Sequence, residues 1–166
     1  MKVSIGRYPK NPNKTRKVSV RIDPSDVWNM DHTLALIVLP MLMRVRNDKG
    51  GSPHVDDEDV PEHIRSSAAP ELTSEQINSG WPDEYHHQRW EWVLDQMIWA
   101  FEQHANPDWE EQYYSGEIDM QVDDAGHLID GPNHTFKTDQ DKIYKHRQAM
   151  QNGLRLFGKY YECLWT

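Results

Sequence analysis

The pattern of apolar and polar residues predicts two short strands at the start of the chain. Between Lys17 and Ile22 apolar and polar residues alternate, and Val3 and Ile5 repeat this period of two. Such alternation is typical of strands with one apolar face. Residues 9–14 are polar and rich in Pro and Asn, which favours a turn. We therefore predict an antiparallel β-hairpin formed by residues 2–8 and 17–22.

Three longer segments have the character of helices. Residues 30–47 contain the stretch Leu34–Val45, which is apolar nearly all round and predicts a buried central helix. We expect a kink at Pro40, because proline leaves the carbonyl four residues earlier unpaired. Apolar residues recur at helical spacing within about 83–104 and 138–164, which predicts two amphipathic helices.

The remaining segments complete an α+β fold. Residues 48–83 hold four prolines and few large apolar side chains, which predicts a long irregular connection. Residues 117–130 alternate on both sides of an Asp-Asp-Ala-Gly sequence, which predicts a short second hairpin. The length of 166 residues fits one domain. We expect residues 1–166 to form that single domain.

Composition and the order of apolar residues bear on where the protein acts. Seven Trp, seven Tyr and three Phe offset an apolar fraction of only 37%, since each aromatic ring can bury roughly 150–250 Å². The longest apolar run, Leu34–Met43, is ten residues, whereas a membrane span needs about 20. The single cysteine, Cys163, excludes an intrachain disulfide and fits a reducing compartment. No secretory signal is evident at the N-terminus, so we expect a cytoplasmic protein without membrane contact.

Charge is distributed unevenly along the chain. The net charge is −9, but residues 1–22 hold no acid, and residues 56–59 are all acidic. Duplex nucleic acid is disfavoured as a partner, because it requires a broad basic surface. A small anionic ligand stays possible, because it needs only one local basic pocket. The basic residues of the N-terminal segment are Lys2, Arg7, Lys10, Lys14, Arg16, Lys17 and Arg21.

Six segments together resemble a widespread family of small proteins of tailed bacteriophages. They are IGRYPK at 5–10, VRIDP at 20–24, WNMDHTLA at 28–35, VDDEDVP at 55–61, RWEWVLD at 89–95 and RLFGKYY at 155–161. The resemblance covers most of the chain, except about 64–80 and 123–137. It implies a phage origin and the host cytoplasm as the setting, and it carries no activity with it. The short link between the N-terminal strands departs from other members, which can hold an insertion there.

Motifs for catalysis, cofactors and metals are absent or incomplete. The sequence has no phosphate-binding glycine loop, no dinucleotide-binding motif and no nucleophile elbow, so we assign no catalytic residue and no cofactor. Nine histidines lack the spacing of zinc ligands, and we assign no metal, although His54 with the acids at 56–59 could hold a cation. Glu91 and Asp95 lie one helical turn apart, which leaves a metal-dependent phosphohydrolase as a third hypothesis.

Cations beside aromatic rings are the sharper signal. Arg155 and Lys159 lie one helical turn apart, a spacing that is favourable when both side chains face an anion. Guanidinium groups suit phosphates and rings suit a base, although the rings could equally be core and the cations a solvated rim. Asp31 and His32 begin a helix, where Asp31 could be the N-cap or an anion could dock. Our candidate ligand-binding residues are Tyr8, Lys10, Arg21, Trp28, His32, Arg89, Arg155 and Lys159.

Two functions from different classes follow. The first is a phage-encoded binding protein that sequesters a nucleotide-like, phosphate-bearing immune signal of the host, as a counter-defence sponge. The alternative is an adaptor or inhibitor that binds a host protein, with the acidic residues 54–62 as its contact. Binding suits this chain better than turnover, because the catalytic signatures are missing. Pockets of such proteins are often built between copies, so we expect a homo-oligomer, with a dimer favoured.

Overall fold

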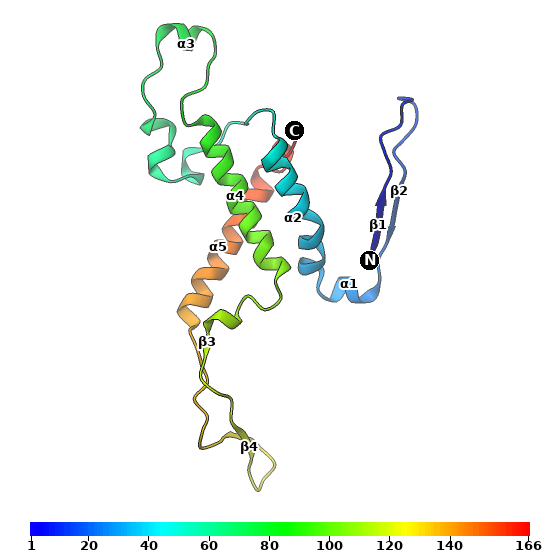
Figure 1. Cartoon of the computed structure of the whole chain (residues 1–166), viewed down its shortest axis with the longest axis vertical. Helices are drawn as coiled ribbons and strands as arrows, with labels where there is room; N and C mark the ends of the chain where they lie inside the picture. The colour runs from blue at the N-terminus through cyan, green and yellow to red at the C-terminus, as the bar shows by residue number, and fades with distance from the viewer.

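The computed structural model describes all 166 residues and shows a three-helix body with projecting arms (Figure 1). The body consists of α2 (Met30–Asp48), α4 (His86–Ala105) and α5 (Gln140–Lys159). Helix α4 is central, because α2 packs against it on one side and α5 on the other. Together with small antiparallel hairpins, these helices confirm the predicted α+β class and place the three main helices close to the expected ranges.

The core follows the apolar stripe of α4. Trp90, Val93, Leu94 and Met97 are fully buried, because their spacing of three and four places them on the faces that meet α2 and α5. Tyr160, just after α5, packs edge-on against Trp90 with ring centroids 5.9 Å apart. None of the helices combines the length and the apolar character that a bilayer span requires.

Helix α2 is less buried than its sequence indicates. Within the Leu34–Val45 stretch only Ala35 and Leu42 are buried, whereas Leu34 and Met41 are exposed. The prediction that this stretch is mostly inaccessible was wrong for a single chain. The reason is topological: α2 packs on α4 alone among the long helices, so nothing covers its outer face. Pro40 lies inside the helix without ending it.

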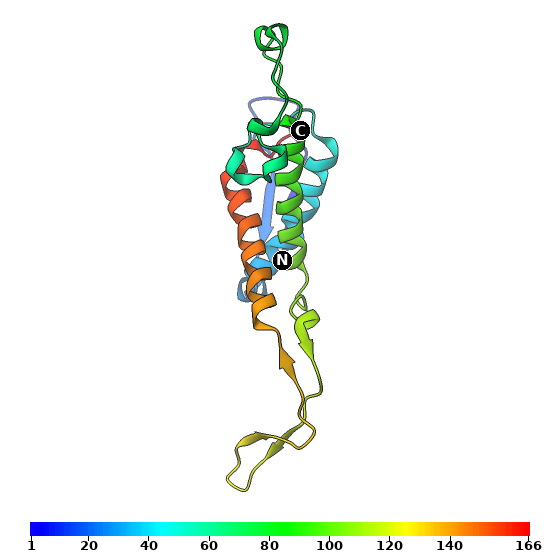
Figure 2. The ribbon, with the colours of Figure 1, turned by 90° about the vertical axis from the view of Figure 1, so that its left-hand side faces the viewer.

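The N-terminal hairpin stands apart from the body (Figures 1 and 2). Strands β1 (Lys2–Ile5) and β2 (Val18–Arg21) pair antiparallel, with Val3 opposite Val20. This confirms the predicted hairpin with shorter strands. The short helix α1 (Pro24–Trp28) then turns the chain into α2. All eight strand residues are exposed.

A second arm extends from the opposite end of the body. Strands β4 (Met120–Val122) and β5 (Leu128–Asp130) form the predicted hairpin, and Gly126 takes a positive φ of 86° in its turn. Below the body, β3 (Tyr114–Ser115) pairs with β6 (Lys137–Thr138). That pair was not predicted, because two residues are too few to show alternation.

The connection between α2 and α4 is partly ordered by the core. It forms the 3-10 turns η1 (Asp57–Asp59), η2 (Glu62–Ile64) and η3 (Ser66–Ala68) and the short helix α3 (Ser74–Asn78). Val55, Val60 and Ile64 are buried in the main core cluster. Its first half therefore packs on the body, while α3 caps a projecting loop (Figure 1). Two further 3-10 turns are η4 (Glu111–Tyr113) and η5 (Tyr161–Cys163).

Candidate functional site

The eight candidate residues fall in separate regions of one chain. Tyr8 and Lys10 follow β1 toward the tip of the hairpin, while Arg21 and Trp28 lie at its base. The other four belong to the helical body, so a single chain does not gather the eight into one pocket. In the body, His32 begins α2, Arg89 lies on α4, and Arg155 and Lys159 lie on α5.

Arg89 is committed to an internal ion pair. Its guanidinium is only 2% exposed and donates to both carboxylate oxygens of Asp83, at 2.9 and 2.5 Å. It also donates to the backbone oxygen of Ile64 at 3.1 Å. The hydrogen bonds from Arg89 hold the pKa of the Asp83 carboxyl below its usual range. This arrangement ties the connection to α4 and leaves no free charge for a ligand.

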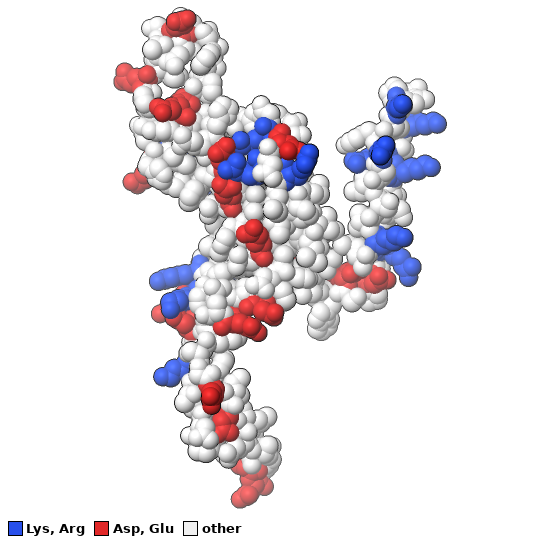
Figure 3. All heavy atoms as spheres, in the orientation of Figure 1, with Lys and Arg blue, Asp and Glu red and all other residues white.

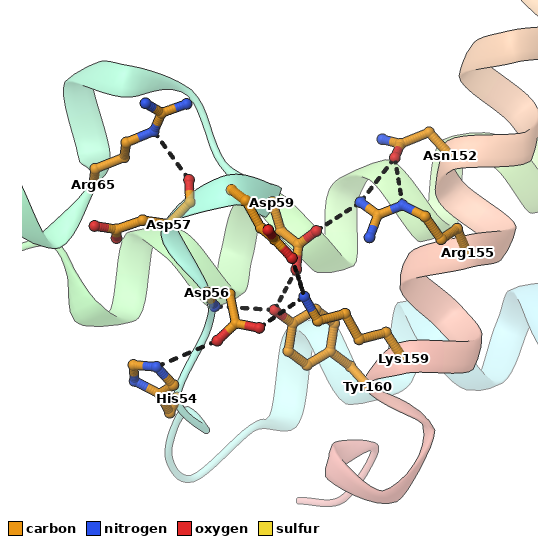
Figure 4. Close-up of polar contacts among 10 residues, drawn as sticks. His54, Asp56, Asp57, Asp59, Arg65, Asn152, Arg155, Lys159 and Tyr160 are labelled. Atoms are coloured by element: carbon orange, nitrogen blue, oxygen red, sulfur yellow. Dashed lines mark hydrogen bonds and ion pairs between the residues drawn. The ribbon is translucent and has the colours of Figure 1, made fainter.

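Arg155 and Lys159 face a carboxylate of their own chain (Figure 4). Asp59, whose side chain is 1% exposed, accepts from Arg155 at 2.6 Å and from Lys159 at 2.6 Å. The Tyr160 hydroxyl donates to the same carboxylate at 2.7 Å and accepts from the backbone amide of Asp56 at 3.0 Å. The anion that this cationic pair faces is therefore a buried aspartate.

The ionisation of this cluster follows from its contacts. Burial alone raises the pKa of the Asp59 carboxyl, but hydrogen bonds from Lys159, Tyr160 and the neighbouring guanidinium outweigh burial and hold the pKa below its usual range. The carboxylates around Lys159 raise the pKa of its ammonium group. Burial, followed by the hydrogen bond to Asp59, raises the pKa of the Tyr160 phenol to about 12.

The same cluster is the one place where acidic ligands for a metal gather. Carboxylate oxygens of Asp56, Glu58 and Asp59 lie within 4.8 Å of one another. The ammonium nitrogen of Lys159 lies among them, at 2.7, 3.0 and 2.6 Å respectively. Since a lysine already supplies the positive charge at their centre, the cluster is a staple between the connection and α5. Sequence reasoning missed it because Lys159 lies 100 residues from the acidic run.

Replacing Tyr160 by Phe should lower the free energy of unfolding by about 1–3 kcal/mol at neutral pH, because Asp59 and the Asp56 amide lose a partner. The neutral phenol is favoured in the folded state. Its contribution is therefore complete below pH 10 and is lost as the pH rises through about 12. Chemical denaturation of both proteins across this range should show the difference shrinking. Tyr144→Phe is the control, because the Tyr144 hydroxyl is exposed and makes no hydrogen bond; an equal loss there would contradict the assignment.

Glu91 and Asp95 also have cationic partners within the body. Arg46 of α2 donates to Asp95 at 2.8 Å, and Lys49 donates to Glu91 at 2.8 Å. Lys49 is the main cause that holds the pKa of the Glu91 carboxyl below its usual range. The two acids therefore join α4 to α2, and the carboxylates face ammonium and guanidinium groups instead of a second acidic pair.

His32 lies beside a small polar cavity at the end of the body. Its Nδ1–H donates to the backbone oxygen of His104 at 3.1 Å, which links the start of α2 to the end of α4. The adjoining cavity, of about 160 Å³, is also lined by Asp31, whose carboxylate lies 3.7 Å from His104. That negative charge at the mouth of the cavity opposes the docking of an anion beside His32.

The basic arm, which we define as residues 1–22, differs electrostatically from everything else in the chain. Figure 3 shows its Lys and Arg side chains without acidic neighbours along its length. Its one ion pair joins Arg21 to Asp23 at 3.8 Å. In residues 23–166, by contrast, Lys137 and Lys145 alone lack an acidic partner. The paired cations there are Arg44, Arg46, Lys49, Arg65, Arg89, Lys142, Arg147, Arg155 and Lys159.

Near the tip of the arm, a cation lies on an aromatic ring. The Arg16 guanidinium lies 4.2 Å from the centre of the Tyr8 ring, and its Nε donates to the backbone oxygen of Gly6 at 2.6 Å. Tyr8 is exposed, and so is Trp28 at the base, at 94%. Sequence reasoning did not select Arg16, because its contact with Tyr8 depends on strand pairing. The arm thus presents rings and unneutralised cations together.

Comparison with protein-family models, with curated proteins and with solved structures gives no match for this chain.

Proposed function

We propose that this protein captures a small phosphate-bearing, nucleotide-like ligand, and that the basic arm is where the ligand binds. The observation that carries the proposal is that the only concentration of unneutralised positive charge lies on the arm. Elsewhere the positive groups are nearly all satisfied by carboxylates of the same chain. An incoming phosphate therefore competes with no internal acid on the arm, while on α5 it would have to displace Asp59.

The tip of the arm suits such a ligand better than its base. Arg7, Lys10 and Arg16 surround the exposed Tyr8 ring in sequence and space, which offers cations for phosphate and a ring face for a base. At the base, Asp23 already lies near Arg21. In the phage setting that the resemblance implies, the ligand would be an immune signal of the host, and binding without turnover would act as a sponge in the host cytoplasm.

The proposal is tested by native mass spectrometry and calorimetry against a panel of cyclic and linear nucleotides, with inorganic phosphate as the base-free probe. Lys10→Gln should weaken nucleotide binding about 10-fold or more, the scale of one hydrogen bond to a charged group. Tyr8→Ala should weaken nucleotides and leave phosphate unchanged. The matched control is Lys145→Gln, which removes an equally unpaired charge from α5 and should change nothing.

Several outcomes of this test count against the proposal. Binding to no nucleotide, or equal weakening by the arm variant and the Lys145 control, would refute the arm as the site. Recovery of the unchanged nucleotide after denaturation supports capture, whereas recovery of a cleaved product would indicate an enzyme.

A second candidate function is a protein-binding adaptor. The acidic residues 54–62 are a poor contact, because Asp56 and Asp59 are already neutralised by Lys159. The projecting loop around α3 is better suited, since it exposes Ile77 and Trp81 far from the body. Exposed aromatic residues of this kind are common anchors of protein interfaces.

A further inference from the structure

We propose that the basic arm docks, through its apolar face, onto the helical body of a second copy of this chain, so that two copies exchange arms in a symmetric dimer. The inference does not depend on the proposed ligand. It starts from the hairpin itself: the pairing of β1 with β2 places Val3, Val20, Ile5 and Val18 on one face. The opposite face carries polar and basic residues, with Lys2 opposite Arg21 and Ser4 opposite Ser19.

The apolar face of the arm has no partner in its own chain. All four of these side chains are exposed, and neither strand packs on a helix of the body. An isolated two-stranded hairpin is marginally stable in water, and it needs a third strand or a helix against its apolar face. Burial of four such side chains would supply this stabilisation, at roughly 1.5–3 kcal/mol for each side chain fully covered.

The body has a matching surface that is also uncovered. A groove of about 330 Å³ runs between α2 and the end of α5, and every side chain lining it is apolar or aromatic. Met41 of α2, at the edge of the groove, is 63% exposed, and it continues a stripe with Leu34 and Met30 at helical spacing. The groove is lined by Val38, Met41 and Val45 of α2 and by Phe157, Tyr161 and Leu164.

Charge complementarity favours a second copy as the occupant. All 27 acidic residues lie outside the arm, whereas seven of the 18 basic residues lie on it. An arm with only positive charge is therefore attracted to a body with excess negative charge, which guides association and disfavours arm-to-arm contacts. A two-fold dimer satisfies both copies at once, because each arm covers the groove of the other and the interface contains two such contacts.

The first experiment measures the mass in solution by light scattering at tens of micromolar. The protein should have twice the 19.6 kDa of one chain, and Val20→Asp should reduce it to one chain. Its matched control is Ser19→Asp, which adds the same charge to the opposite face and should leave the dimer intact. Met41→Glu should dissociate the dimer through the groove, while Met43→Glu, exposed but outside the groove, should not. Circular dichroism should show that each variant keeps its helices.

The second experiment separates exchange between copies from an arm that folds back on its own body. Val20→Asp and Met41→Glu, each a monomer alone, should form a dimer when mixed, because one intact arm then meets one intact groove. If the mixture stays monomeric, the arm docks within its own chain and the proposal is overturned. A monomeric parent protein would overturn it too, and so would a Val20→Asp variant that remains a dimer.

Discussion

Replacing Asp83 by Ala should lower the free energy of unfolding by about 3–5 kcal/mol, because it strands the buried guanidinium of Arg89. Arg89 is nearly inaccessible and receives both carboxylate oxygens of Asp83 as acceptors. The Ile64 carbonyl would remain its only polar partner. Urea denaturation followed by circular dichroism gives the change directly.

The control for this prediction is an ion pair at the surface. Arg44 and Asp48 pair one turn apart on α2 with largely exposed side chains, so Asp48→Ala should cost less than about 0.5 kcal/mol. The double variant Asp83→Leu with Arg89→Met should lose less stability than Asp83→Ala, because no buried charge is left unpaired. A loss below 1 kcal/mol for Asp83→Ala would mean that Arg89 is not buried as described.

The second large effect is expected at the contact between α4 and α5. Gly153 lets the two helices approach so closely that an added Cβ would overlap the Cβ of Ala100 and lie 2.6 Å from the backbone oxygen of Gln96. Gly153→Ala should therefore lower the free energy of unfolding by about 1–3 kcal/mol, the usual cost of overpacking, despite the better helix propensity of alanine. Thermal unfolding would show a lower Tm.

Gly158 provides a control of opposite sign on the same helix. An added Cβ there meets no atom, so Gly158→Ala should raise the free energy of unfolding, by up to about 1 kcal/mol. Destabilisation by both alanines would indicate that α5 tolerates neither, whereas stabilisation by both would mean that the helices do not meet at Gly153.

Local sequence patterns were sufficient for the elements of this protein. Period-two alternation at both ends of the N-terminal hairpin, and the apolar stripes of α4 and α5, depend on residues within about one or two turns of each other. The structure confirms these elements with boundaries shifted by a few residues. Helix α2 was also found, but its burial was overestimated, because an apolar sequence does not say whether a partner lies on every side.

The state of the candidate cations was decided by tertiary structure alone. Arg155 and Lys159 read equally well as an anion site or as a solvated rim, and the structure instead sets them against Asp59. An ion pair is a property of two charges brought within a few ångströms of each other. That distance depends on how the whole connection packs across α4 and α5, since the paired residues are about 100 positions apart. The sequence by itself determined the hairpin, the helices and a first segment with only basic charges, because those are local properties. The tertiary structure decided which charges are neutralised and which apolar faces stay open, because only folding brings distant segments together.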